Sequence, residues 1–240
     1  MTTTLFRDDA YLKVTSASVL DVNDTGIVLN QTNFYAAGGG QPGDKGTIKI
    51  GADEIEIADT VYGTDKTTIY HVPANADHGL KVGDDVTLEL DWDTRFNHMR
   101  MHTALHLLCS IIPFQVTGGS IGALESRLDF DMPETVDKGA VTEALMALVN
   151  ADHSTFTRFI TDDELDLNPD LVRTLSVQPP RGSGQIRLVG IGDNGAVDLQ
   201  PCGGTHIKST SEIGAIHIGK IEKKGKMNRR LRVRFGAMPT

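Results

Sequence analysis

The sequence predicts an α+β protein in which a small β-barrel precedes a domain that mixes helices and strands. Residues 1–90 consist of short runs that alternate apolar and polar side chains, separated by turns rich in Gly, Asn and Asp. Several short strands at this spacing are typical of a small barrel. From Trp92 the apolar residues recur at helical spacing instead. We therefore expect an N-terminal β-barrel domain over residues 1–91 and a second domain over 92–240.

The expected barrel carries a glycine-rich segment. Its strands are expected at 11–19, 26–29, 47–50, 54–57, 67–70 and 86–90. Between the second and third of these lies Gly38-Gly39-Gly40-Gln41-Pro42. Three consecutive glycines indicate either a long hairpin turn or backbone N–H groups that closely approach a ligand. No Gly-Lys-Ser/Thr follows, so this is not a Walker loop, and we expect no nucleotide cofactor.

The second domain is expected to open with a helix over 92–112. Asp91, Asp93 or Thr94 can cap its start, and Pro113 ends it. One apolar stripe of this helix contains Phe96, Met101, Ala104, Leu105, Leu108 and Ile112. A second helix is expected at 133–150 and an acidic surface segment at 162–170. Strands are expected at 115–122, 126–130, 155–160, 186–191, 213–221 and 229–235.

Two short motifs about a hundred residues apart predict a metal site. His102 and His106 are four residues apart on the first helix, so one face can present both imidazoles to a cation. Cys202 and His206 flank Gly203-Gly204, which favours a loop that brings a thiolate and an imidazole together. Three nitrogens and one sulfur suit zinc better than magnesium or calcium. Cys109, three residues after His106, offers a rival ligand set.

Composition describes an ordinary globular chain of 240 residues, 39% hydrophobic and 23% charged. No signal peptide or membrane span is visible, and two cysteines exclude a disulfide scaffold, so we expect a cytoplasmic protein. Net charge is −9, yet residues 208–234 hold nine Lys or Arg against two Glu. A basic stretch on an acidic chain is typical of a protein that touches nucleic acid at one place. A pair of strands with a charged, solvated face is the alternative.

The combination of these motifs, in this order, is more specific than any one of them. Gly38-Gly39-Gly40-Gln41-Pro42, His102-Thr103-Ala104-Leu105-His106, Thr117-Gly118-Gly119-Ser120, Pro201-Cys202-Gly203-Gly204-Thr205-His206 and the basic C-terminal hairpin resemble the freestanding alanyl-tRNA editing proteins of medium size. The resemblance covers essentially the whole chain. It implies that residues 92–240 form a two-layer, zinc-containing editing domain of the type common to threonyl- and alanyl-tRNA synthetases.

The resemblance also implies an activity and roles for individual residues. These proteins are trans-editing hydrolases that deacylate mischarged tRNA(Ala), releasing serine or glycine. One Zn2+ per chain would be held by His102, His106, Cys202 and His206. Substrate-binding positions would be Thr117, Gly118, Gly119, Gly39, Gly40 and Gln41. Candidates for tRNA phosphate contacts are Lys223, Lys224, Lys226, Arg229 and Arg230.

Three other functions fit parts of the same pattern. One is a zinc-stabilised RNA-binding module without catalysis, because four protein ligands resemble a closed structural site. Another is a zinc hydrolase of small esters, which would not need the basic stretch. A third keeps the deacylase and changes the substrate, for instance to threonyl-tRNA. The sequence also leaves open whether the metal activates water or holds the substrate's amino group.

Overall fold

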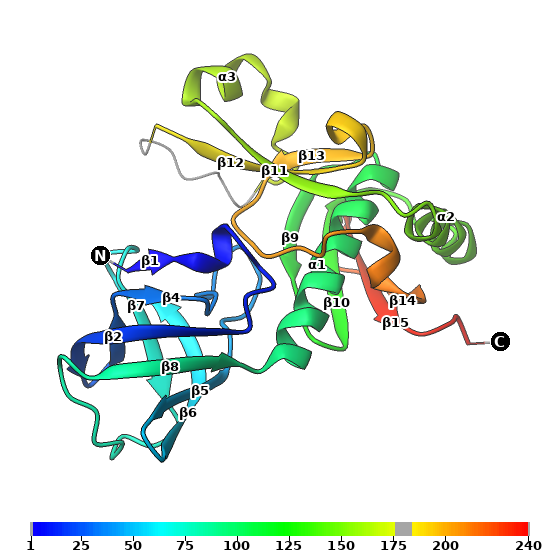
Figure 1. The fold of residues 1–240 in the computed structure, drawn as a ribbon. Helices are drawn as coiled ribbons and strands as arrows, with labels where there is room; N and C mark the ends of the chain where they lie inside the picture. The colour runs from blue at the N-terminus through cyan, green and yellow to red at the C-terminus, as the bar shows by residue number, and fades with distance from the viewer. Residues whose placement is uncertain (1, 176–183, 240) are drawn as a thin grey trace. The chain divides into compact units, whose positions relative to one another are not determined.

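The computed structural model describes residues 2–175 and 184–239, which form two compact units, Met1–His98 and Met99–Thr240. Figure 1 labels the elements of both units. The first unit is a β-barrel, and the second combines two sheets with helices, which confirms the predicted α+β class. Helix α1 (Trp92–Ile111) begins in the first unit and continues into the second.

Six strands close the barrel. In pairing order they are β2 (Val14–Asn23), β3 (Gly26–Leu29), β7 (Ile69–Pro73), β6 (Asp53–Tyr62), β5 (Gly46–Ile50) and β8 (Asp85–Leu90). Alternate residues of these strands, such as Ile48, Ile57 and Leu88, are fully buried inside. Two short strands, β1 (Thr3–Thr4) and β4 (Gln31–Thr32), pair in parallel beside it, and a 3-10 turn, η1 (Leu5–Arg7), follows β1.

The glycine-rich segment forms a two-residue turn, shorter than the predicted long hairpin. Gly38 and Gln41 exchange backbone hydrogen bonds of 3.1 and 2.9 Å, and Gly39 and Gly40 between them have φ angles of +58° and +85°. Two consecutive positive φ angles are the signature of a type I′ turn, which side chains other than Asn, Asp or Gly rarely adopt. The turn conformation therefore accounts for two of the three glycines.

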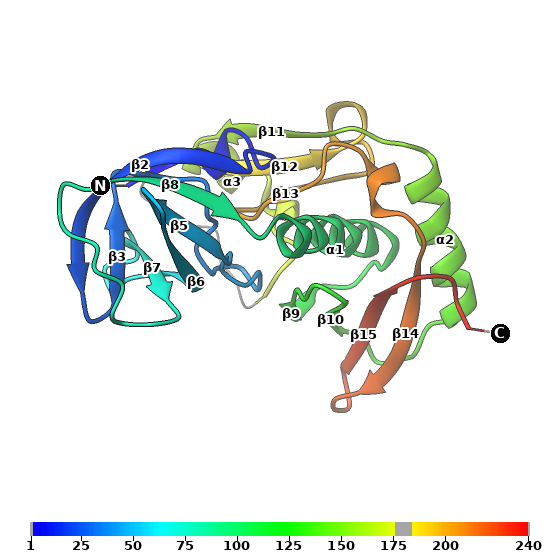
Figure 2. The ribbon, with the colours of Figure 1, turned by 60° about the horizontal axis from the view of Figure 1, so that its bottom comes forward.

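The second unit holds two separate sheets. One has the order β14 (Ile216–Lys223), β15 (Asn228–Phe235), β10 (Glu125–Asp131) and β9 (Val116–Ser120). The other consists of β11 (Thr155–Ile160), β12 (Ile186–Ile191) and β13 (Asp198–Pro201). Figure 2 shows α1 between these sheets, and α2 (Lys138–Asn150) packs against β14.

Helix α1 differs from its prediction because both sides of it are covered. The sequence predicts an apolar stripe and a more polar opposite face, but residues 101–109 are buried all round. The Asp91 carboxylate accepts a hydrogen bond from the Thr94 backbone at 3.2 Å, so Asp91 is the capping residue among the three candidates. A helix enclosed on all sides must satisfy its polar side chains inside the protein.

Local capping shifts three other predicted elements. Helix α2 starts at Lys138 because Asp137 caps it, five residues later than predicted. The acidic segment folds into α3 (Asp162–Leu167), started by a capping box between Thr161 and Glu164, and into η2 (Pro169–Leu171). Ile213, expected to begin a strand, instead ends η4 (Thr210–Ile213), so that β14 starts three residues later than predicted. The 3-10 turn η3 (Asp193–Gly195) precedes the unpredicted strand β13.

Candidate metal centre

Four side chains of the second unit converge as the sequence predicts. His102 and His106 come from consecutive turns of α1, and Cys202 and His206 come from the loop after β13. One donor atom from each of the four lies within 4.8 Å of every other. Cys109 is buried on the same helix but is not part of this cluster, so the rival ligand set is not the one that forms.

The spacing of these donors fits a four-coordinate metal ion. The Cys202 Sγ lies 3.4 Å from His102 Nε2 and 3.3 Å from His206 Nε2. Bonds of the usual length to nitrogen and thiolate sulfur would place donors roughly 3.3–3.7 Å apart at the corners of a tetrahedron. The three imidazole rings also lie together, with the His206 centroid 4.2 Å from that of His102 and 4.6 Å from that of His106. The cluster can therefore hold a metal ion.

The loop that carries Cys202 and His206 is held in place by β12. Cys202 donates its backbone N–H to the Arg187 carbonyl at 3.1 Å. In return, the Arg187 guanidinium donates to the carbonyls of Cys202 and Gly204, at 2.7 and 3.0 Å. The Gly204 N–H lies 3.4 Å from the Cys202 sulfur, and a side chain at Gly203 would meet open space. These contacts thus fix the loop that carries Cys202 and His206, and leave open space beside Gly203.

Electrostatics in the cluster favour a thiolate. Burial would raise the pKa of Cys202, but the neighbouring imidazoles of His102 and His206 lower it well below its ordinary value. Burial lowers the pKa of His206, and the nearby His102 lowers it further. Burial would also lower the pKa of His106, but the hydrogen bonds that its ring donates to Asp198 and Cys202 raise it to about 10. A metal ion requires the thiolate and neutral imidazoles, so binding of an ion would displace the extra proton that His106 holds at neutral pH.

Three polar residues that contact the cluster were not predicted. Asp198 and Gln200 lie on β13 beside His106, and Thr103 lies on α1 beside His206. The signal was present, because residues 198 and 200 alternate along a strand that leads directly to Cys202 and must share a face. Thr103 stands inside the His102–His106 motif itself. Strand β13 was not predicted, so Asp198 and Gln200 were not recognised as neighbours of the cluster.

The predicted substrate-binding residues of this unit lie on the four-stranded sheet. Thr117 is on β9, where its hydroxyl donates to the Asp129 carbonyl at 3.1 Å and accepts from the Asn228 amide at 2.7 Å. Gly118 and Gly119 follow it and pair with β10. No hydrogen bond found among the described residues joins Thr117 to the four metal-ligand candidates. Gly39, Gly40 and Gln41 belong to the barrel turn.

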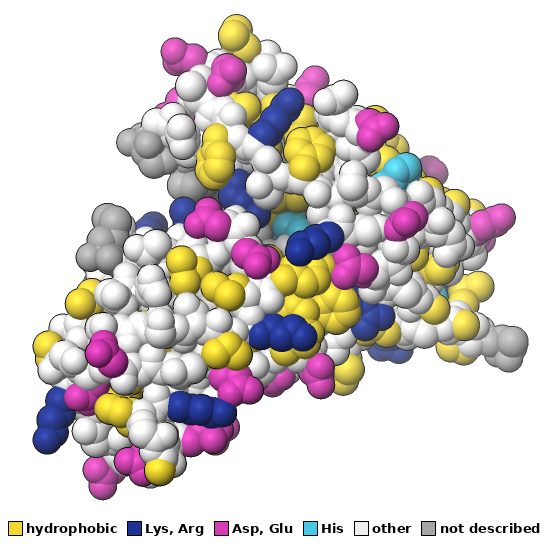
Figure 3. Space-filling view, in the orientation of Figure 1, with side chains coloured by type: hydrophobic (Ala, Val, Ile, Leu, Met, Phe, Trp, Pro, Cys, Tyr) yellow, Lys and Arg dark blue, Asp and Glu magenta, His cyan; other side chains and the backbone are white. Residues whose placement is uncertain are grey.

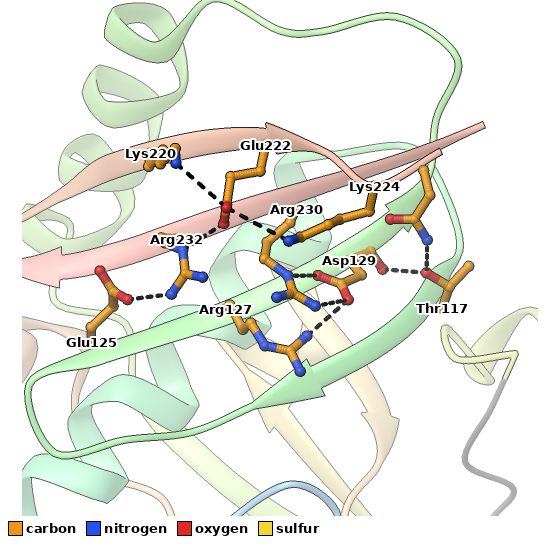
Figure 4. Close-up of polar contacts among 10 residues, drawn as sticks. Thr117, Glu125, Arg127, Asp129, Lys220, Glu222, Lys224, Arg230 and Arg232 are labelled. Carbon is orange, nitrogen blue, oxygen red and sulfur yellow. Dashed lines mark hydrogen bonds and ion pairs between the residues drawn. The ribbon is translucent and has the colours of Figure 1, made fainter. Parts of the chain in front are cut away.

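The predicted tRNA-binding residues lie on the β14–β15 hairpin, where acidic side chains partly neutralise them. Figure 4 shows Glu222 between Lys224, Lys220 and Arg232, and Asp129 between Arg127 and Arg230. Both guanidinium contacts from Arg230 to Asp129 measure less than 3.0 Å. On the face drawn in Figure 3, Lys and Arg side chains are likewise scattered among Asp and Glu. The basic stretch is therefore a ladder of ion pairs more than a uniform positive field.

Arg229 differs from its neighbours in this ladder. It is buried, and its guanidinium donates to the carbonyls of Pro133, Gly225, Lys226 and Asn228. Because these bonds close the hairpin, the role of Arg229 in the structure is to hold the turn that presents Lys223, Lys224 and Lys226. The sequence could not distinguish it from the adjacent Arg230.

Comparisons with known proteins agree with the fold and the cluster. Residues 186–232 match the family described as the threonyl and alanyl tRNA synthetase second additional domain, and residues 5–94 match the class II (A) tRNA synthetases. An alanyl-tRNA editing protein AlaX-M of Methanosarcina acetivorans is 35% identical, over 96% of this chain and 98% of its own length. An AlaX-M protein of Pyrococcus horikoshii is 32% identical, over 93% of this chain and 92% of its own.

A longer relative, a synthetase, is similar to this chain over part of its length. An alanine–tRNA ligase of Pyrobaculum aerophilum is 36% identical over 91% of this chain, which spans only 25% of the ligase. Barrel, second additional domain and His/Cys cluster together define the class of aminoacyl-tRNA deacylases built on synthetase editing domains. Within that class the chain belongs to the alanyl-tRNA editing proteins of the AlaX-M type. Among the described residues, no helix has the length and apolar character that crossing a membrane requires.

Proposed function

We propose that this protein is a trans-editing hydrolase that removes serine from mischarged tRNA(Ala), using a zinc ion held by His102, His106, Cys202 and His206. The converging donor set carries the proposal, because three imidazoles and one thiolate match the ligand preference of zinc. When bound, zinc supplies a positive charge that can polarise an ester or activate water. The substrate, mischarged tRNA(Ala), agrees with the names of the relatives.

The need for such a site follows from the limits of steric selection. A synthetase pocket sized for alanine cannot exclude glycine by size and rejects an added hydroxyl only weakly, so errors must be removed afterwards. An editing site can favour serine if it contains polar groups that pair with the serine hydroxyl. Alanine would leave those groups buried without partners, which costs about 1–3 kcal/mol for each.

Thr117 is our candidate for reading the serine hydroxyl. Its own proton is given to the Asp129 carbonyl and one lone pair is taken by the Asn228 amide. One lone pair is left, so Thr117 would accept a hydrogen bond from serine and could not donate one. Backbone N–H groups near Gly118-Gly119 and Gly203-Gly204 are candidate donors to the oxyanion of the tetrahedral intermediate. We retain Gly39, Gly40 and Gln41 as proposed substrate contacts alongside their turn role.

The test is deacylation of Ser-tRNA(Ala) and Ala-tRNA(Ala) by the full chain. We expect rapid hydrolysis of the seryl ester only, and a loss of more than about 100-fold in His106→Ala, because a ligand is removed. His78→Ala, outside the cluster, should hydrolyse Ser-tRNA(Ala) at the wild-type rate. Thr117→Val should narrow the difference between the rates at which the seryl and alanyl esters are hydrolysed. Survival of both esters in zinc-loaded protein would contradict the proposal and leave an RNA-binding module.

A further inference from the structure

Outside the four candidate ligands, His106 contacts a buried acidic group. The Asp198 Oδ2 lies 2.9 Å from His106 Nδ1, and Asp198 is 2% exposed. The Gln200 amide nitrogen lies 2.8 Å from the same carboxylate oxygen and 3.1 Å from His106 Nδ1. Both residues come from β13, where Asp198 lies four positions and Gln200 two positions before Cys202. The strand thus places an acid and an amide on the same face, directly before the loop that carries the Cys202 thiol.

The direction of these hydrogen bonds fixes the state of His106. An ionised carboxylate only accepts, so the proton between Asp198 and His106 belongs to Nδ1 of the imidazole. Gln200 then donates to Asp198, which holds the carboxylate in this orientation. In the neutral ring the lone pair is on Nε2, the nitrogen that a metal ion would bind. Asp198 therefore fixes a proton on Nδ1 of His106, so that a metal ion would take the place of the proton on Nε2 alone.

His206 is oriented in the same way by a neutral group. Thr103 donates its hydroxyl to the Met99 carbonyl at 3.0 Å, so it accepts from His206 Nδ1 at 3.1 Å. This leaves His206 Nε2, the atom 3.3 Å from the Cys202 sulfur, without a proton. Thr103 and Asp198 thus orient two imidazoles equally well, but only Asp198 brings a charge.

The charge of Asp198 is costly unless a cation balances it. Its second oxygen, Oδ1, is buried and makes no hydrogen bond within the described part of the chain. Burying a carboxylate with half of its hydrogen bonds unmade costs several kcal/mol. A divalent cation bound by one thiolate and three neutral imidazoles carries one net positive charge. Asp198 is the carboxylate in direct contact with that ligand set.

We propose that Asp198 is a positioning residue of the metal centre, which holds His106 in its metal-binding tautomer and balances the charge of the bound cation. Gln200 fixes the carboxylate, and Thr103 is its uncharged counterpart at His206. This inference rests on the proposed metal site and extends it to residues that are not ligands. Partners of this kind change metal affinity by 10–100-fold when they are removed.

The experiment measures zinc affinity rather than turnover. Full-length protein is stripped of metal and titrated with zinc against a chromophoric chelator at pH 7. We expect Asp198→Asn, which keeps the shape and removes the charge, to weaken zinc binding by about 10–100-fold. Asp198→Ala should weaken it at least as much, and Thr103→Val should weaken it less than Asp198→Asn. The matched control is Asp193→Asn, which changes an exposed acidic residue in the connection between β12 and β13.

The outcomes separate this inference from the proposed function. The absorption spectrum of the cobalt-substituted protein should change with Asp198→Asn, because the ligand field at His106 changes, and stay constant with Asp193→Asn. The melting temperature of each metal-free variant shows whether it is folded, and Gln200→Ala provides a milder change at the same contact. Wild-type zinc affinity in Asp198→Asn, within twofold, would overturn the role of Asp198 and leave the deacylase intact. Failure of the wild-type chain to bind zinc would overturn both.

Discussion

His71 is a histidine that the barrel buries as a neutral group. Its Nδ1 lies 3.1 Å from the Ile27 carbonyl, which can only accept, so Nδ1 carries the proton. Its Nε2 then accepts from the Thr32 hydroxyl at 2.8 Å. Burial lowers the pKa of His71 to about 4. A ring with both nitrogens engaged has no place for a second proton, so protonation and folding of the barrel are opposed.

This opposition predicts a pH dependence of stability. Between pH 6.5 and 4 the unfolded state binds a proton at residue 71 and the folded state does not, so stability falls as pH falls. A pKa lowered from 6.5 to about 4 corresponds to roughly 3 kcal/mol of unfolding free energy lost across this window. Urea unfolding at pH 7 and pH 4.5, followed by the fluorescence of the single tryptophan, Trp92, measures it.

Two variants identify the residue responsible. His71→Gln keeps a polar side chain and cannot take up a proton, so we expect most of the difference between the two pH values to disappear. His78→Gln replaces a histidine outside the barrel core and should leave the difference in place. Equal pH dependence in His71→Gln and the wild-type protein would assign the effect to other groups.

The four residues of the candidate metal centre were predictable at the residue scale, and the groups that orient them were not. His102, His106, Cys202 and His206 belong to residue types with few common roles, at spacings that suit one cation. Asp198 is one of 32 acidic residues, and composition gives no reason to single it out. Only the knowledge that Asp198–Pro201 is a strand leading to Cys202 places Asp198 near the cluster. The orienting groups thus depend on an element that local patterning misses.

At the scale of elements, the residues that start and end a helix were predicted correctly, and the burial of helices by distant parts of the chain was not. Pro113 and Asp91 bound α1 close to its prediction, since capping and proline act locally. That α1 is enclosed between two sheets depends on strands spread along the chain from residue 116 to residue 235, which local patterning does not connect to the helix. The acidic segment at 162–170 looked like a solvated loop, yet burying Leu165 turns it into α3. A single buried apolar side chain within many charges is too weak a signal to predict a helix.

The basic residues of the β14–β15 hairpin are expected to have two different roles. Lys223, Lys224 and Lys226 flank the turn, whereas Arg229 is buried and bonded to backbone carbonyls. Replacing one of the lysines by Ala should weaken binding of tRNA and flatten the slope of log K against log salt by roughly 0.7–0.9, the loss of one phosphate contact. Filter binding across 50–200 mM salt measures this slope. Turnover at saturating tRNA should stay near the wild-type rate.

Arg229→Ala should behave differently from the lysine variants. It removes several hydrogen bonds from a buried guanidinium to backbone carbonyls and should lower the unfolding free energy by about 2 kcal/mol or more. Lys49→Ala, on the barrel, is the control for the salt slope. A lysine variant that loses rate at saturating tRNA and keeps the full slope would assign that residue to the reaction and not to phosphate binding.

At the scale of the whole molecule, the barrel was predictable because each strand carries its own evidence. Each strand can be recognised from its own alternation of apolar and polar residues and from the Gly and Asn turns beside it. Closure of the barrel follows because six strands must each bury one face. The second unit is different, since its two sheets are assembled from segments distant in the chain. The predicted boundary, residue 91, separates the barrel strands from the segments of the second domain. The two compact units divide slightly later, within α1 after His98.

This division predicts an unequal response to metal removal. All four ligands belong to the second unit, so a bound ion stabilises that unit by about 2.7 kcal/mol at a hundredfold excess over the dissociation constant. The barrel contributes no ligand. Chelation should therefore lower hydrogen-exchange protection in residues 99–175 and 184–239, most of all in α1 and β13, while the barrel strands keep theirs.

Trp92 provides an independent probe of the first unit. Its ring stacks on Phe96 at 5.5 Å, and the Lys13 ammonium lies 4.4 Å above it, with all three residues in that unit. We expect its fluorescence to keep the same urea midpoint with and without zinc, while the helical circular dichroism signal shifts to lower urea in the metal-free protein. His106→Ala should abolish the zinc-dependent difference. A common midpoint for both signals, moving together on chelation, would mean that the two units unfold as one and would contradict the prediction.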